Sequence, residues 1–140
     1  MCKDSSVVTE SEHHLGERGM RRVRVVNATR QQVLAERAEV AESFLRRGIG
    51  LLGRSDWSRS DGLVIVPSDG VHSFFMKMTI DVLHLAKDGT VKRILPSMKP
   101  WRIGPIVWGG HAAVELPPGL AAKTGTVVGD HIVTEMLDEG

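Results

Sequence analysis

The most regular stretch of the chain runs from Val71 to Leu85, where side chains alternate with the period of two that a β-strand gives. Alternate positions along one side are almost all apolar: His72, Phe74, Met76, Met78, Ile80 and Val82. The other side is mixed and carries Lys77 and Asp81 together with Ser73, Phe75 and Thr79. After Asp81 three of the next four residues are apolar, which indicates burial on both faces of a sheet or a β-bulge. We therefore predict a central strand over residues 71–85.

Shorter apolar runs, separated by turn residues, predict further strands. They cover residues 21–26, 31–34, 62–67, 91–95, 112–116 and the end of 126–133. Asp88-Gly89 stands between two such runs and is a strong hairpin signal. Residues 35–47 carry apolar side chains at three- and four-residue steps, with glutamates early and arginines late, which predicts a helix. A single helical turn is expected at 120–124.

These elements predict a mainly β domain of the α+β kind. We expect an antiparallel sandwich or a partly closed barrel of six to seven short strands, with one main helix packed at one end. Residues 1–20 are polar and aperiodic, so we interpret them as a disordered leader. Residues 21–134 then form one globular domain, and residues 135–140 form a flexible tail.

Composition narrows the function classes. The 140 residues have a formal net charge of +1, which does not favour a nucleic acid or a membrane surface as partner. The only cysteine is Cys2, so we expect neither an intramolecular disulfide nor a cysteine zinc site. No signal peptide and no apolar run of membrane-spanning length is visible. We expect a cytoplasmic protein with no metal and no cofactor, whose oligomeric state is left open.

One set of ionisable and aromatic side chains could form a binding site: His72, Lys77, Asp81, Trp101, Arg102 and Glu115. A tryptophan offers a stacking face and an arginine a forked donor, so this polar patch on the sheet could bind a small polar or anionic ligand, or a partner segment. The alternative is that the same charges form structural pairs, Lys77 with Glu115 or Arg54 with Asp81, that fix the strand register.

Two further functions stay open. Asp81 and Glu115 could act as the paired carboxylates of a small hydrolase or carbohydrate-active enzyme if they lie close together in space. No serine in a G-x-S-x-G context and no cysteine outside the leader supports another nucleophile, so we lean away from an enzyme. The arginines at 21, 22, 24, 46, 47 and 54 could bind nucleic acid weakly if they converge on one face.

Several phrases occur in an order and spacing that resemble the domain-of-unknown-function family 192, a family of small bacterial and archaeal domains. They are Phe44 to Arg54, His72 to Leu85, Asp88-Gly89, Pro100 to Arg102, Glu115-Leu116-Pro117 with Gly119, and Val128-Gly129-Asp130. The resemblance extends from about Val23 to Val133. It implies a mainly β, sandwich-like single domain with one helix, and it implies no activity. The positions it marks as structural are Gly50, Gly53, Arg54, Asp88, Gly89, Gly129 and Asp130.

Overall fold

A computed structural model describes residues 21–41, 57, 60–68, 70 and 78–137. Within these ranges the chain forms seven strands and one short helix. They are β1 (Arg21–Asn27), β2 (Gln32–Ala41), β3 (Leu63–Ile65), β4 (Ile80–Leu85), β5 (Val91–Met98), β6 (Ala112–Leu116), α2 (Leu120–Lys123) and β7 (Ile132–Met136). The mainly β class predicted from the sequence is confirmed.

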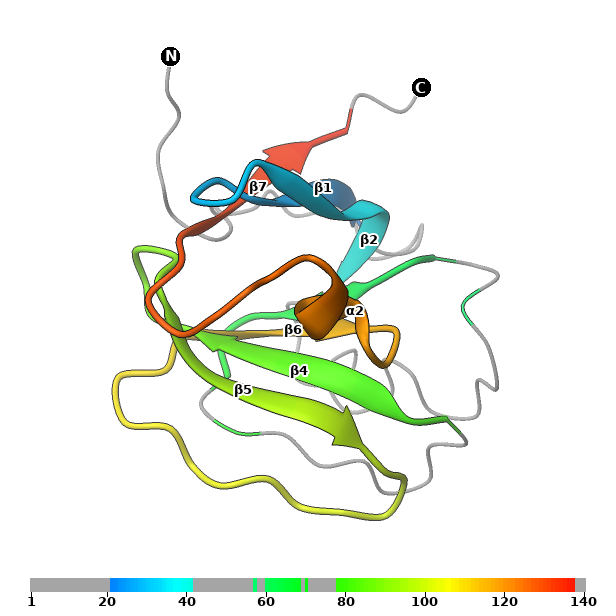
Figure 1. Ribbon diagram of the computed structural model, residues 1–140, viewed down its shortest axis with the longest axis vertical. Helices are drawn as coiled ribbons and strands as arrows, with labels where there is room; N and C mark the ends of the chain where they lie inside the picture. The colour runs from blue at the N-terminus through cyan, green and yellow to red at the C-terminus, as the bar shows by residue number, and fades with distance from the viewer. Residues whose placement is uncertain (1–20, 42–56, 58–59, 69, 71–77, 138–140) are drawn as a thin grey trace.

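All seven strands belong to one sheet, in the order β5-β4-β6-β3-β2-β1-β7 (Figure 1). Neighbouring strands are antiparallel except β2 and β3, which run parallel. β4 is the second half of the predicted central strand; it has a paired strand on each side, and all of its residues are buried. Burial on both faces explains why the alternation of side chains stops after Asp81. Residues 71–77 lie outside the described residues, and Met78 and Thr79 are described but are not strand, so the predicted strand is confirmed only from Ile80.

The sheet curls until its two edges approach each other at one end. Thr90, just before β5, forms an isolated antiparallel bridge with His131, just before β7. The Val91 N–H donates to the carbonyl of Asp130 at 2.8 Å, and the Ile132 N–H donates to the carbonyl of Gly89 at 2.9 Å. Only an isolated bridge and a few turn hydrogen bonds join the edges, so the sheet is partly closed and is not a barrel.

The sheet buries a hydrophobic layer on each face. Leu83, Val114 and Leu116 belong to the layer that also contains Ala121 of α2. Val82 and Leu63 belong to the layer on the opposite face. Successive residues of a strand alternate between the two layers because their side chains point to opposite faces.

The predicted helix at 35–47 is wrong over its first half, because residues 35–41 belong to strand β2. Alanine and glutamate favour a helix when the segment is considered alone. In the molecule the segment pairs with β1 on one side and β3 on the other, and this pairing overrides the local preference. The ladder between β1 and β2 contains register shifts. The alternation of side chains is broken at such shifts, so that exposed and buried residues follow one another in pairs along the first part of β2. Residues 42–47 lie outside the described residues.

Other local predictions agree with the structure. Asp88-Gly89 forms the turn between β4 and β5, with Gly89 at a φ of 95° that glycine adopts without strain. The predicted helical turn at 120–124 is α2.

The predicted tail begins too early. β7 continues through Met136, so residues 135 and 136 are strand rather than tail. Among the described residues, the structure contains no helix with the length and hydropathy to cross a membrane.

Candidate functional site

Asp81 is a buried carboxylate that is fully used by the backbone around it. Its Oδ1 accepts hydrogen bonds from the N–H of Ser97 at 2.9 Å and of Gly119 at 3.0 Å. Its Oδ2 accepts the N–H of Ala121 at 2.9 Å. These bonds tie β4 to β5 and to the start of α2. The carboxylate therefore joins three chain segments, and it is not presented to solvent.

Glu115 is a second buried carboxyl group, on β6. Its cross-strand neighbours are Leu63 of β3 and Val82 of β4, so apolar side chains flank it on both sides. No hydrogen bond from the described residues reaches its carboxyl group in the structure. Burial alone raises the pKa of Glu115 to about 8, so the group is mainly protonated at neutral pH. It is a neutral acid within the core.

The structure does not bring Asp81 and Glu115 together. Asp81 is paired with Leu116, and Glu115 is paired with Val82. Directly paired residues point to the same face, and Leu116 and Val82 belong to the layers on opposite faces. The two carboxyl groups are separated by the sheet itself. The paired-carboxylate hydrolase therefore has no geometric support.

Other ionisable side chains are buried on the face that holds Glu115. His84 lies on this face, diagonally across the β4–β6 ladder at roughly 7–8 Å between Cα atoms. Glu39 of β2 is paired with Leu63, which is itself a cross-strand neighbour of Glu115. The Glu39 carboxylate forms an ion pair with the Arg22 guanidinium at 3.3 Å. Within the described part of the chain, no three His, Cys, Asp or Glu side chains are arranged to hold a metal ion. The expectation of no metal site remains a prediction.

Trp101 and Arg102 lie in the long loop between β5 and β6. The loop runs along the lower rim of the molecule, drawn in yellow in Figure 1. Both side chains are exposed. The Arg102 guanidinium donates to the carbonyl oxygens of Pro100 at 3.2 Å and Trp101 at 3.5 Å, and so braces the loop at its bend. His72 and Lys77, with Gly50, Gly53 and Arg54, lie outside the described residues.

The sequence reasoning missed the rest of this loop. Large apolar side chains are exposed at four positions in it: Trp101 (54%), Ile103 (71%), Ile106 (68%) and Trp108 (88%). We call residues 99–108 the tryptophan loop. The signal that could have identified it is the run W-R-I-G-P-I-V-W between Pro100 and Gly109, which is largely apolar but has neither strand nor helix period. Such a run is expected either in the core or at a contact surface.

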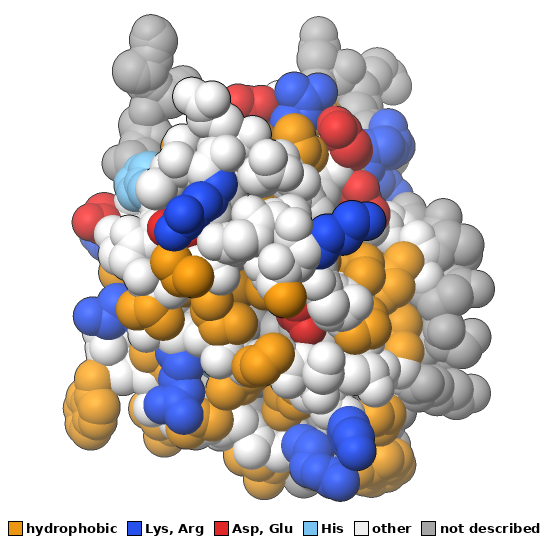
Figure 2. Space-filling model, viewed as in Figure 1, with side chains coloured by type: hydrophobic (Ala, Val, Ile, Leu, Met, Phe, Trp, Pro, Cys, Tyr) orange, Lys and Arg blue, Asp and Glu red, His pale blue; other side chains and the backbone are white. Residues whose placement is uncertain are grey.

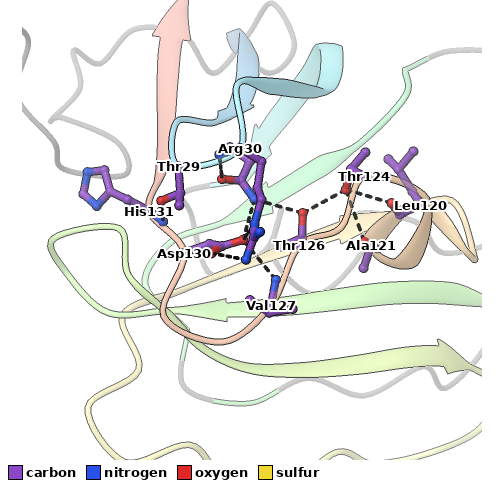
Figure 3. Close-up of polar contacts among 10 residues, drawn as sticks. Thr29, Arg30, Leu120, Ala121, Thr124, Thr126, Val127, Asp130 and His131 are labelled. Carbon is purple, nitrogen blue, oxygen red and sulfur yellow. Dashed lines mark hydrogen bonds and ion pairs between the residues drawn. The ribbon is translucent and has the colours of Figure 1, made fainter.

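Asp130, from the Val128-Gly129-Asp130 phrase, organises a separate polar cluster (Figure 3). Its carboxylate accepts two hydrogen bonds from Arg30, at 2.9 and 3.2 Å, and one at 3.0 Å from the amide of Asn27. The Val127 N–H donates a further one at 3.0 Å. The bond from Arg30, supported by those from Asn27 and Val127, lowers the pKa of Asp130 to about 2. The cluster joins the β1–β2 turn to the segment before β7, which is a structural role.

These features define a class of protein: a domain of one curled β-sheet, with its buried carboxyl groups inside and an aromatic loop outside. The chain belongs to the domain-of-unknown-function family 192, whose model, described as an uncharacterised family, matches residues 25–134. This agrees with the resemblance noted between Val23 and Val133.

Curated relatives are similar in sequence over most of the chain, and solved structures share its fold. A UPF0127 protein of Thermococcus sibiricus is 28% identical over 120 residues, which is 82% of this chain and 77% of the relative. A protein of unknown function from Novosphingobium aromaticivorans has a TM-score of 0.65 and 19% identity, over 94% of this chain and 97% of that one. A “putative transcription regulator” from Sinorhizobium meliloti has a TM-score of 0.67 and 22% identity, over 85% and 98%. At these identities the two structures show a shared fold alone.

Proposed function

We propose that this protein is a non-enzymatic binding domain, and that the tryptophan loop is its contact surface. The observation that supports this most directly is the exposure of four large apolar side chains within eight residues of one loop. Single exposed apolar residues are common on protein surfaces, whereas a contiguous group of them marks an interaction site. Each such side chain contributes about 1.5–3 kcal/mol when a partner buries it fully.

The backbone at Trp101 gives independent support. Its φ is 63°, in the left-handed region that a bulky side chain rarely adopts. A glycine there would avoid a cost on the order of 1–2 kcal/mol. The ring is about half exposed, so packing against the domain offsets only part of that cost. A tryptophan at this position is understandable if its ring is needed for contact with a partner.

The loop is also held in place, as a contact surface requires. Val107 is buried, while its neighbours Ile106 and Trp108 are exposed. The Gly110 N–H donates to the carbonyl of Val107 at 2.9 Å and closes a turn just after it. Val107 thus anchors the loop and directs the side chains on either side outward. A surface ordered before contact loses less conformational entropy on binding.

The other functions considered from the sequence receive less support. Asp81 and Glu115 point to opposite faces, which does not favour a hydrolase. The β1 arginines interact with carboxylates, Arg22 with Glu39 and Arg24 with Glu36 and Glu135, which does not favour nucleic acid as their partner. A polar patch on the sheet that includes His72 and Lys77 remains a prediction.

The test is a comparison of matched baits in a cell extract. Three forms of the protein are immobilised: the wild type, the double variant Ile103→Ser with Trp108→Ser, and the control Val128→Ser. The control removes an apolar side chain that is 60% exposed but lies outside the loop. We expect a component retained by the wild type and the control to be lost with the double variant. Retention that is identical for all three baits would contradict the proposal.

A further inference from the structure

We propose that the partner of the tryptophan loop is the surface of an anionic lipid membrane, into which the loop inserts at the level of the headgroups. The inference rests on the proposed function and specifies its partner. The sequence led us to expect no membrane partner, because no apolar run could span a bilayer. A loop that lies within the interface needs no such run.

The apolar side chains of the loop match the layers of a membrane surface. Trp101 and Trp108 stand at the two ends of the exposed run, and tryptophan is enriched where hydrocarbon meets headgroups. Ile103 and Ile106 lie between them and are the aliphatic residues that would reach the acyl boundary. The loop therefore presents two tryptophans suited to the headgroup level and two isoleucines suited to the acyl boundary.

Charge around the loop is complementary to an anionic surface. Between Gly89 and Val114 the sequence contains Lys92, Arg93, Lys99 and Arg102 and no aspartate or glutamate. This segment alone therefore carries four positive charges in a chain whose net charge is +1. The lowest part of the face drawn in Figure 2 shows apolar and basic side chains.

One of the cations is directly beside the loop. The Lys92 Nζ lies 3.7 Å from the position that a Cβ on Gly109 would occupy, next to Trp108. Lys99 and Arg102 belong to the loop itself and are exposed. Basic residues at a membrane surface attract anionic headgroups while neighbouring apolar side chains insert. The loop places both kinds of residue on one short segment.

Two other partners fit these observations less well. A nucleic acid would use the tryptophans for stacking and the cations for phosphates, but it has no use for two exposed isoleucines. A protein partner of stable affinity buries about 800 Å² on each side, usually with a polar rim around an apolar centre. A loop of ten residues along one rim suits a deformable lipid surface better. Both alternatives are outcomes of the test.

The probes are vesicles of phosphatidylcholine alone and of equal parts phosphatidylcholine and phosphatidylglycerol. Two of the three tryptophans, Trp101 and Trp108, lie in the loop, so intrinsic fluorescence reports on it directly. We expect the wild type to sediment with the anionic vesicles. Its emission should shift to the blue, and lipids brominated near the headgroup should quench it. Added salt should weaken the binding, because it screens charges at the surface.

Three variants separate the contributions. Ile103→Ser with Trp108→Ser should abolish the blue shift and sedimentation. Lys92→Gln with Lys99→Gln should weaken partition into anionic vesicles about 25-fold, from about fivefold for each cation removed. Val128→Ser should behave as the wild type. Circular dichroism of each variant establishes that it is folded before its binding is interpreted.

The outcomes distinguish this inference from the proposed function. If the wild type does not bind anionic vesicles, or if the loop variants bind as the wild type does, the membrane inference is overturned. Should the extract experiment still give a component whose retention depends on the loop, the binding function stands and its partner is a protein or a nucleic acid. If the wild type does not bind anionic vesicles and no component of the extract depends on the loop for its retention, both proposals are overturned.

Discussion

At the scale of single residues, three of the buried carboxyl groups are stabilised in different ways. Asp81 and Asp130 are satisfied by donors around them, three backbone N–H groups in one case and mainly Arg30 in the other. Glu115 has apolar neighbours on both adjacent strands and is kept neutral by burial. The sequence identified Asp81 and Glu115 as ionisable groups in apolar runs. It could not reveal that a shift of one residue in the ladder places them on opposite faces.

The protonation of Glu115 predicts how stability depends on pH. Its pKa rises from 4.5 in the unfolded chain to about 8 in the folded one. Between these values only the unfolded chain ionises, so stability falls as pH rises through this window. At pH 7 the loss is on the order of 3 kcal/mol. Glu115→Gln should therefore match the wild type near pH 5 and exceed it near pH 8 in urea denaturation. An equal difference at both pH values would show that Glu115 is not buried as described.

Asp130 predicts the opposite behaviour, in acid. Its pKa is lowered from 3.8 to about 2 by Arg30, Asn27 and the Val127 N–H. The stability that it contributes is present above pH 4 and is lost as pH falls through about 2. Asp130→Asn should therefore lower the melting temperature at pH 6, and the difference from the wild type should shrink toward pH 2. A difference that does not change with pH would mean that the charge of Asp130 is not what stabilises the fold.

At the scale of elements, the sequence predicts those strands and turns whose own residues carry a strong local signal. The strand around Val82 and the hairpin at Asp88-Gly89 were predicted because their residues carry local signals. β2 was not, because Ala35, Ala38 and Ala41 suit a helix locally, and only their pairing with β1 and β3 makes them strand. The apolar content of the tryptophan loop likewise could not distinguish core from surface.

The close packing of β2 against the start of β3 gives a third prediction. A Cβ at Gly62 would lie 3.2 Å from the Cβ of Ala35 and from a methyl group of Leu116. The Ala35 Cβ is attached to the backbone of a paired strand and cannot rotate away. Gly62→Ala should lower the free energy of unfolding by about 1–2 kcal/mol, measured by urea denaturation.

Gly70→Ala is the matched control for that change. At Gly70 the nearest atoms would lie 3.8–4.0 Å from the new Cβ, which is ordinary van der Waals contact. Replacing glycine there should leave stability unchanged or raise it by about 0.5 kcal/mol, because the unfolded chain loses conformational freedom. If Gly62→Ala is as stable as Gly70→Ala, the described approach of β2 and β3 is wrong.

At the scale of the whole molecule, the buried carboxyl groups and the tryptophan loop have different roles. The buried carboxyl groups lie inside the curled sheet, where Asp81 and Asp130 connect segments that are distant in sequence. Four exposed large apolar side chains lie on the tryptophan loop, in a segment whose charged residues are all basic. The sequence predicted a binding patch that would combine these groups. Among the described residues of that patch, Trp101 and Arg102 are exposed, whereas Asp81 and Glu115 are buried on opposite faces of the sheet.

The central claim is that the exposed apolar side chains of the tryptophan loop serve contact with a partner and contribute little to the stability of the fold. Its most direct test is to measure stability and vesicle partition together on one variant, Ile103→Ser with Trp108→Ser. Because both side chains are mostly exposed, the free energy of unfolding in urea should stay within about 1 kcal/mol of the wild type, while partition into anionic vesicles is lost. A loss of several kcal/mol in stability with partition unchanged would contradict the account.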